Sequence, residues 1–196
     1  MTYVTTECKL ADLELIEDSM GWWHGYYAKA CFRASVCRCV SLNIDSKCVG
    51  IGLYYVLNTR PIIGVVYYIA IASKLRGQGL GKVLLASIEH LMEEEGAEVF
   101  IATSALDNEN AIRLFKSMGY IVLEWSELVK HVGYDVYELL LRATCGYEDD
   151  VVMIKSFKSD KFDRVLTNLV NNRNIRVANR VWYTICYEPW RRVRML

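Results

Sequence analysis

The sequence lacks a net charge of either sign. Its 23 Lys and Arg residues equal its 23 Asp and Glu residues, so the formal net charge is zero. A chain without an overall positive field offers no electrostatic footprint for nucleic acid or for an anionic membrane. Any binding partner therefore has to be found from local features of the chain.

Histidine is scarce, and the cysteines form no recognisable pairs. His24, His90 and His131 are far apart and lack the short spacing of metal ligands, so we expect no metal site. The seven cysteines are an odd number and contain no Cys-x-x-Cys pair. This pattern favours free buried thiols in a reducing compartment over a disulfide framework.

Long uninterrupted apolar runs are missing as well. The first nine residues lack the basic start and apolar stretch of a signal peptide, and charged residues interrupt the run Val36 to Val56. We therefore expect a cytoplasmic protein with no membrane partner.

The composition that is present is that of a globular protein. Apolar residues make up 53% and charged residues 23% of the 196 residues, which predicts a packed core in one domain or in one domain with an appendage. Residues 1–145 carry 13 basic and 17 acidic side chains, whereas residues 146–196 carry 10 and 6. This change from −4 to +4 predicts a main domain over 1–145 and an extension over 146–196.

Periodicity predicts an alternation of strands and helices in the main domain. The expected strands are Val4–Leu10, a hairpin in Cys37–Leu57 that turns at Asn43–Lys47, Ile62–Ala72, Val99–Thr103, Tyr120–Leu123 and a closing strand at Tyr134–Leu141. The expected helices begin near Leu13, at Trp22, at Gly79 and at Asn108. The fold class is therefore α/β, as a mixed (α+β) sheet flanked by helices.

Aromatic residues on the second helix are open to two interpretations. Trp22, Trp23, Tyr26 and Tyr27 recur at helical spacing, which favours packing in the core and leaves a substrate wall as the alternative.

The extension is expected to contain a strand at Val151–Phe157, a helix at Phe162–Val170 and a strand at Arg180–Tyr187. We expect this αβ unit to pack on the domain, at the edge of its sheet, or on a partner chain in a homodimer. Arginines and a tryptophan near its end resemble a nucleic-acid surface, but six acidic residues in the same segment argue against that partner.

One segment carries a chemical signal. The residues Arg76-Gly77-Gln78-Gly79-Leu80-Gly81-Lys82 follow an apolar strand and open a helix. Glycines let the backbone approach a ligand, and the first N–H groups of a helix lack partners within the helix, so the segment suits a phosphate. Its spacing fits neither a Walker loop nor a dinucleotide fingerprint.

The segment resembles the Arg/Gln-x-x-Gly-x-Gly/Ala signature of the GCN5-related N-acetyltransferase (GNAT) family, at Arg76, Gly79 and Gly81. The run from Asn108 to Tyr120 is similar to the family's second signature. The resemblance covers roughly residues 4–143 and implies the GNAT-like acyl-CoA N-acyltransferase fold, with the αβ extension added to it.

The resemblance also implies a co-substrate, acetyl-CoA, and residues that bind it. In the family two central strands separate, and here that arrangement would leave backbone groups of Ile69 and Ile71 for the pantetheine amides. Arg76 to Lys82 would bind the pyrophosphate. Asn108 would be a further cofactor contact, a helix N-cap, or both.

The usual catalytic groups of the family are absent from their places. The tyrosine that protonates the leaving thiolate corresponds to Phe115, and the glutamate base of the ribosomal-protein N-terminal acetyltransferases corresponds to Thr103. The glutamate of the histone-type enzymes falls near Ile63 or Gly64.

Three explanations stay open for this departure. Tyr67, Tyr68 or Glu124 substitutes for the missing groups, positioned reactants proceed without a dedicated acid, or the domain binds coenzyme A without turnover. Because neighbours on a strand point to opposite faces, we expect at most one of the two tyrosines to face the site. The resemblance therefore favours transfer of an acetyl group to a primary amine of unidentified nature, with a coenzyme A-binding module that uses the extension as an interaction surface as the alternative.

Overall fold

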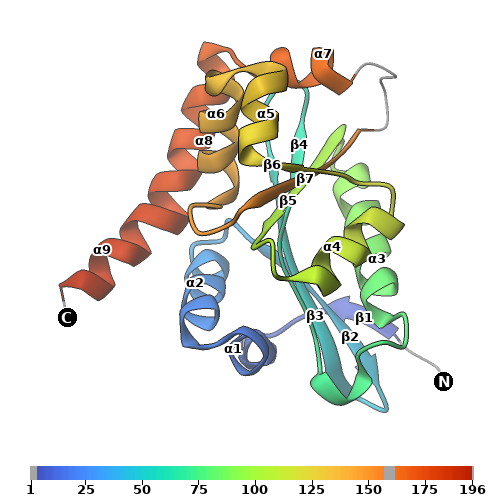
Figure 1. Ribbon diagram of the computed structural model, residues 1–196. Coiled ribbons are helices and arrows are strands. Elements are labelled where there is room, and N and C mark those ends of the chain that lie inside the picture. Colours follow the sequence, from blue (N-terminus) through green and yellow to red (C-terminus); the bar gives the residue numbers. More distant parts are fainter. Residues whose placement is uncertain (1–3, 157–161, 196) are drawn as a thin grey trace. The chain divides into compact units, whose positions relative to one another are not determined.

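The computed structural model describes residues 4–156 and 162–195 of the chain (Figure 1). The strands are β1 (Val4–Glu7), β2 (Arg38–Ile44), β3 (Lys47–Leu57), β4 (Ile63–Ile71), β5 (Val99–Ser104), β6 (Ile121–Glu124) and β7 (Val151–Ser156). The helices are α1 (Glu14–Met20), α2 (Trp22–Arg33), α3 (Leu80–Glu94), α4 (Glu109–Ser117), α5 (Trp125–Val132), α6 (Tyr134–Thr144), α7 (Phe162–Thr167), α8 (Asn172–Trp182) and α9 (Glu188–Arg194). The described chain also contains short 3-10 helical turns at Leu10–Leu13 and Ser73–Leu75 and a π-helical turn at Tyr183–Tyr187. None of the helices in the described ranges is long and apolar enough to cross a membrane.

Two compact units make up this part of the chain. The first contains residues 4–55, 66–92 and 184–195, and the second contains residues 56–65, 93–156 and 162–183. Strands β3 and β4 run through both units. Hydrogen-bonded neighbours follow the order β1-β2-β3-β4-β5-β7-β6, which confirms the predicted mixed sheet flanked by helices.

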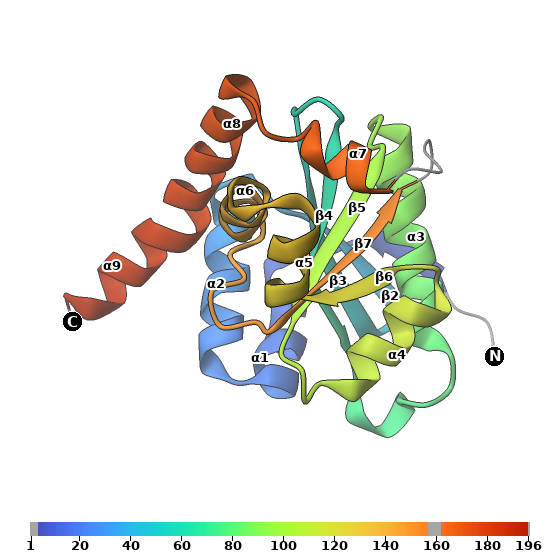
Figure 2. The ribbon, with the colours of Figure 1, turned by 45° about the horizontal axis from the view of Figure 1, so that its top comes forward.

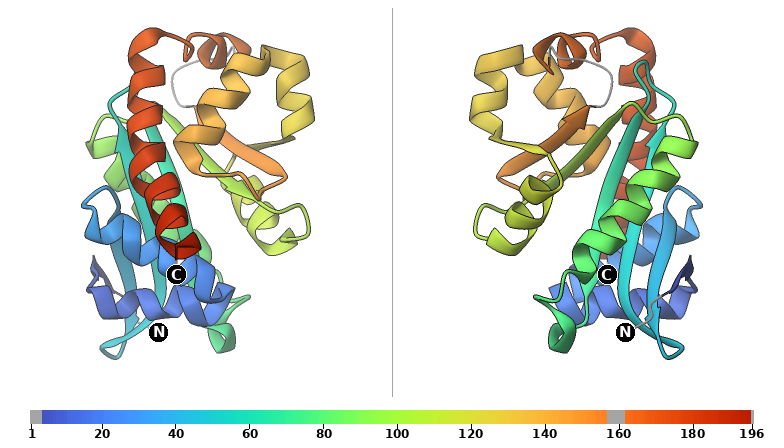
Figure 3. Two further views of the ribbon diagram at one scale, coloured as in Figure 1. Left: turned by 90° about the vertical axis from the view of Figure 1, so that its left-hand side faces the viewer. Right: turned by 90° about the vertical axis from the view of Figure 1, so that its right-hand side faces the viewer.

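The first unit is built on the hairpin of β2 and β3, as predicted. Asp45 and Ser46 turn the chain with positive φ angles of 48° and 63°. Helix α3 covers one face of these strands, and α1 and α2 cover the other (Figure 3). A Cβ atom at Gly52 would lie 2.3 Å from Cδ1 of Ile88, so glycine at this position allows α3 to pack directly on β3.

The second unit contains β5, β7 and β6 side by side (Figure 2). Strand β7 pairs antiparallel with β5 from Val99↔Ser156 to Ser104↔Val151, and with β6 on its other edge. The first strand of the extension is therefore an inner strand of the sheet and not an edge strand. Of its predicted range, Phe157 lies outside the described residues.

Two predicted strands are wrong, because both segments are helical. The segment predicted as Tyr134–Leu141 belongs to α6, in which Val136, Leu139, Leu140 and Ala143 form one buried face at helical spacing. Gly133, with φ of 91°, separates α6 from α5, a helix that periodicity did not predict.

The segment predicted as a strand at Arg180–Tyr187 continues α8 into the π-helical turn. Its β-branched and aromatic residues favour a strand locally, but Ile185 and Cys186 are buried in helical geometry. Helix α8 itself starts at an N-cap, where the side chain of Asn171 accepts from the backbone N–H groups of Arg173 and Asn174.

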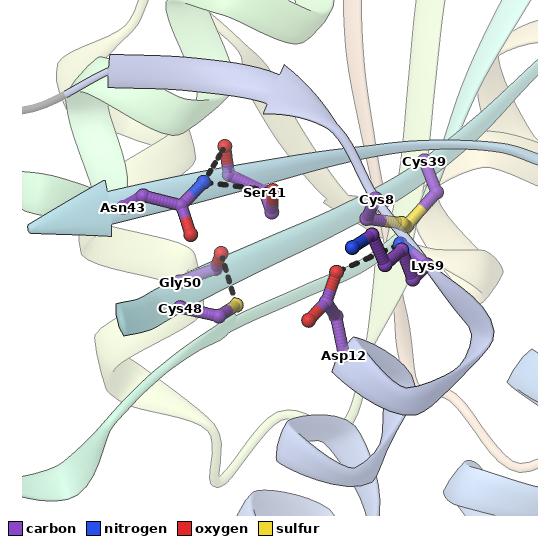
Figure 4. Close-up of a disulfide and its surroundings, with 8 residues drawn as sticks. All are labelled: Cys8, Lys9, Asp12, Cys39, Ser41, Asn43, Cys48 and Gly50. Carbon is purple, nitrogen blue, oxygen red and sulfur yellow. Dashed lines mark hydrogen bonds between the residues drawn. A yellow bond between two sulfur atoms is a disulfide. The ribbon is translucent and has the colours of Figure 1, made fainter. Parts of the chain in front are cut away.

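The prediction of free thiols is wrong at six of the seven cysteines, all but Cys48. Cys8 forms a disulfide with Cys39, at a Cα–Cα distance of 5.5 Å (Figure 4), and Cys31 forms one with Cys37 at 5.3 Å. Cys8 follows β1, which pairs with β2, and this pairing brings residues 31 positions apart into register. A count of cysteines cannot reveal such pairing.

Cys48 on β3 carries a free thiol, which donates to the carbonyl oxygen of Gly50 at 3.4 Å. Burial and the nearby carboxylate of Asp12 raise the pKa of this thiol. Because removing the negative charge lowers that pKa, we expect Asp12→Asn to speed alkylation of Cys48 by iodoacetamide at pH 8 by roughly a few-fold. Asp18→Asn on α1 serves as the control, and an unchanged rate in Asp12→Asn would contradict the influence of Asp12.

The aromatic side chains of α2 are more exposed than the favoured interpretation, packing in the core, predicts. Trp22 and Trp23 are each 52% exposed, whereas Tyr26 and Tyr27 are half-buried. Trp22 stacks on Tyr26, whose hydroxyl donates to the carbonyl oxygen of Pro189 at 3.1 Å. Only the tyrosine half of the predicted face packs inward.

Candidate active site

The segment from Arg76 to Lys82 forms an open turn between β4 and α3, within the first unit (Figure 1). Gly77 and Gly79 have φ angles of 77° and 81°, which L side chains rarely adopt. A Cβ atom built on either residue would meet no atom within 4 Å. The glycines therefore bend the backbone and leave open space beside it.

The turn presents a row of backbone donors. In the described part of the chain, the N–H groups of residues 77–81 have no hydrogen-bond acceptor, whereas those of Lys82 and Val83 donate to the carbonyl oxygen of Gly79 at 3.0 and 3.4 Å. Five consecutive donors at the positive end of α3 suit an anion with several oxygen atoms. The structure of this segment thus fits the pyrophosphate that its sequence predicts.

The last residues of β4 have the backbone orientation expected for binding an extended ligand. The N–H of Ala72 donates to the carbonyl oxygen of Val49 on β3 at 2.9 Å. Because backbone groups alternate sides along a strand, those of Ile69 and Ile71 point to the edge away from β3. Pairing of β4 with β5 covers Ile63–Val65, and β4 continues to Ile71.

One of these backbone groups already has a partner. The Nε of Arg76 donates to the carbonyl oxygen of Ile71 at 3.0 Å. The arginine therefore holds the end of β4 to the start of the turn. The prediction that Ile71 is free to pair with a ligand needs this correction, although a carbonyl oxygen can accept a second bond.

The phenols of Tyr67 and Tyr68 lie together, and the expectation that they point to opposite faces is wrong. Their ring centroids are 4.5 Å apart, and the ring of Tyr67 also meets that of Tyr55 at 5.7 Å. His24 of α2 contacts Tyr68 edge to face at 5.7 Å. The two rings contact each other, so strict alternation of side chains does not hold at this pair.

Burial and the neighbouring phenols both affect the pKa of Tyr67. Burial, together with the neighbouring phenols, raises the pKa of Tyr67 well above its ordinary value of 10.0, and burial does the same for Tyr55. A phenol with a raised pKa remains protonated at neutral pH, so Tyr67 cannot act as a base there.

The other predicted residues belong to the second unit. Asn108 is the N-cap of α4, where its Oδ1 accepts from the N–H of Ala111 at 3.3 Å; a contact with the cofactor remains a prediction. Glu124 is the exposed N-cap of α5, and its N–H donates to Oε2 of Glu127 at 3.0 Å. The capping geometry gives Glu124 a structural role, and its catalytic role remains a prediction.

The positions of the missing family residues have their own surroundings. Phe115 is buried and packs edge to face on Tyr120 at a centroid distance of 4.8 Å. Thr103, on β5, donates its hydroxyl proton to Oδ2 of Asp149. Asp149 lies just before β7, which begins at Val151. The sequence analysis did not predict this contact between Thr103 and Asp149.

Comparisons with known proteins support these observations. The model of the acetyltransferase (GNAT) family matches residues 8–120, more than half of the chain. A mycothiol acetyltransferase from Corynebacterium aurimucosum is 34% identical over 64 residues, which are 33% of this chain and 21% of that protein. The chain thus matches about a fifth of the length of this relative.

Solved structures show the same fold at low identity. An IAA acetyltransferase from Bacillus cereus has a TM-score of 0.58 at 14% identity, over 80% of this chain and all of that one. A GNAT family acetyltransferase from Elizabethkingia anophelis with acetyl-CoA bound has a TM-score of 0.57 at 9% identity, over 79% and 98%. With the glycine turn, the donor row and the family match in agreement, the chain belongs to the acetyltransferase (GNAT) family.

Proposed function

We propose that this chain transfers the acetyl group of acetyl-CoA to a primary amine. The observation that carries the proposal is the row of five backbone donors at residues 77–81, at the start of α3. A related fold that binds acetyl-CoA, that of the Elizabethkingia anophelis protein, supports the same ligand. The pyrophosphate would bind this turn, and the pantetheine would follow the edge of β4 at Ile69 and Ile71.

The proposed reaction needs two proton movements. The nitrogen of a neutral amine attacks the thioester carbonyl carbon, so that a C–N bond forms and the C–S bond breaks. The nitrogen loses a proton, and the departing thiolate gains one. Of the predicted residues, we propose Tyr67, a phenol that is protonated at neutral pH, as the donor to the thiolate; its raised pKa makes it a weaker acid than an ordinary phenol.

Amine-dependent turnover tests the proposed function. The purified chain is mixed with acetyl-CoA and a panel of small amines and peptides, and mass spectrometry measures coenzyme A and acetylated amine. We expect both products with at least one acceptor. Binding of coenzyme A without either product across the panel would support the alternative, a coenzyme A-binding module.

Tyr67→Phe tests the proposed proton donor. The substitution removes only the hydroxyl group, and we expect kcat to fall by about 10²-fold, the lower end of general acid–base effects, with an unchanged Kd for coenzyme A. Calorimetry and initial rates check the two quantities.

Tyr55→Phe is the matched control, because Tyr55 belongs to the same aromatic cluster and also has a raised pKa. We expect its kcat to stay within a few-fold of the wild-type value. Equal losses in the two variants would show that the cluster acts through packing and would remove Tyr67 from the mechanism.

A further inference from the structure

Helices α1, α2 and α9 belong to the first unit and form one surface, which we call the three-helix surface. A Cβ atom at Gly25 of α2 would lie 2.5 Å from Cβ of Glu17, so α1 and α2 pack directly on each other. On α9, the carbonyl oxygen of Pro189 accepts from the hydroxyl of Tyr26 at 3.1 Å. Helix α2 thus contacts both neighbours, and it lies between α1 and α9 in Figures 1 and 2.

Large apolar side chains are exposed on this surface. Trp22 and Trp23, at the start of α2, are each 52% exposed, and Trp190 on α9 is 42% exposed. The other two tryptophans of the chain are half-buried. Met20, which ends α1, and Met195, which follows α9, are exposed as well. Tryptophan and methionine are enriched in contacts between proteins, so the three-helix surface has the composition of an interface.

Helix α1 gives one side of the surface a negative charge. It contains Glu14, Glu17 and Asp18 and no basic residue. Glu17 is half-buried, and its Oε2 lies 2.6 Å from Nζ of Lys29 on α2. The carboxylates of Glu14 and Asp18 are exposed, and neither makes an ion pair or a hydrogen bond with the described residues. Two negative charges on α1 therefore have no partner in the described part of the chain.

Helix α9 gives the other side a positive charge. Its three arginines, Arg191, Arg192 and Arg194, are all exposed, and Glu188 is its single acidic residue. Oε2 of Glu188 lies 3.1 Å from Nη2 of Arg191 and 3.9 Å from Nε of Arg192. The guanidinium of Arg194 lies 4.5 Å from the ring centroid of Trp190. The three arginines and one glutamate give α9 a net charge of +2, which is equal in size and opposite in sign to the unpaired charge of α1.

We infer that the three-helix surface is the interface of a homodimer, in which α9 of each chain binds α1 of the other. A twofold axis presents the same surface of both copies to each other, so every contact of α9 with α1 occurs twice. The positive charge of one helix then meets the negative charge of the other on both sides of the axis. The exposed tryptophans of α2 lie between these charged contacts, where the second copy removes them from water.

Charge complementarity favours a second copy of this chain over an anionic partner. A phospholipid or nucleic-acid surface would attract the arginines of α9, but it would repel the unpaired carboxylates of Glu14 and Asp18 on the same surface. A second copy of the chain satisfies both charges at once. Interfaces between proteins also combine a polar rim with an apolar centre, and the charged outer helices and the aromatic α2 have this arrangement.

Two double variants of the full chain test the inference by reversing the charge of one helix at a time. The α1 variant combines Glu14→Lys with Asp18→Lys, and the α9 variant combines Arg192→Glu with Arg194→Glu. In sedimentation velocity at tens of micromolar protein, we expect the wild type to have twice the 22.6 kDa mass of one chain. Either variant places like charges opposite each other, so we expect the dissociation constant of its dimer to rise at least about tenfold.

An equimolar mixture of the two variants should dimerise again, because the introduced lysines of one chain then face the introduced glutamates of the other. The matched control combines Lys47→Glu with Lys74→Glu. Both lysines are exposed on the first unit outside α1, α2 and α9, and the change in net charge equals that of the α9 variant. We expect the dissociation constant of this control to match that of the wild type.

A monomeric wild type would overturn the inference, also where the arginines of α9 bind anionic phospholipid vesicles or DNA instead. A wild-type dissociation constant in either variant would contradict the pairing of α1 with α9. So would a mixture that stays monomeric while far-UV circular dichroism shows both variants folded. No part of the experiment uses acetyl-CoA, so its outcome is independent of the proposed function.

Discussion

Replacing Gly79 by aspartate abolishes measurable binding of coenzyme A. Gly79 has a φ of 81°, and its N–H is one of the five free donors of the turn. An aspartate strains the backbone by roughly 1–2 kcal/mol and places a negative charge where the pyrophosphate would lie. We expect calorimetry to show a rise in Kd of at least about 10²-fold. The backbone strain disturbs the turn, and the carboxylate repels the pyrophosphate at the positive end of α3.

Gly119→Asp is the matched control for this result. Gly119 follows α4, has a φ of 88° and also has open space around it, so the backbone strain is of the same kind. We expect this variant to bind coenzyme A with the wild-type affinity. Wild-type affinity in Gly79→Asp would contradict the assignment of the pyrophosphate to residues 76–82.

Removing everything after Cys145 leaves no cooperatively folded protein. The truncation deletes β7, which pairs with β5 on one edge and with β6 on the other. Four of its side chains, Val151, Val152, Met153 and Ile154, are at most 1% exposed. At roughly 1.5–3 kcal/mol for each buried side chain, their loss amounts to about 6–12 kcal/mol. That range is comparable to the entire stability of a typical domain, about 5–15 kcal/mol.

A shorter truncation after Tyr187 serves as the control. It retains β7 and α8 but removes α9 and the carbonyl oxygen of Pro189, to which Tyr26 donates. We expect this fragment to stay soluble and to melt at a modestly lower temperature. A fragment 1–145 that is soluble and melts as sharply as the full chain would contradict the role of β7.

Local patterns were sufficient to predict most of the first 120 residues. The turn at Asp45 and Ser46, the buried strand β4 and the amphipathic helix α3 each have a periodicity and a boundary signal of their own. The predictions of strands in the later segments were wrong for a physical reason. In α6 the residues Val136 and Leu140 fit both a two-residue and a helical period, and burial against the rest of the unit decides between them.

In the candidate site too, features with a local sequence signal could be predicted, and features that depend on distant contacts could not. The glycine turn is a local feature, so its residues and its position between β4 and α3 could be predicted from the sequence, whereas its ligand stays a prediction. The bond between Thr103 and Asp149 depends on how β7 returns to β5, and no local pattern encodes such a distant contact. The contact of the Tyr67 and Tyr68 rings likewise depends on their neighbours, Tyr55 and His24, from β3 and α2.

Stoichiometric product formation tests the central claim most directly. The wild-type chain is incubated with acetyl-CoA and each amine of the panel, and mass spectrometry quantifies coenzyme A and the acetylated amine together. We predict equal amounts of the two products for at least one amine of the panel, and neither product with Gly79→Asp. Bound acetyl-CoA that stays intact with every amine, or coenzyme A released without acetylated amine, would contradict acetyl transfer at this site.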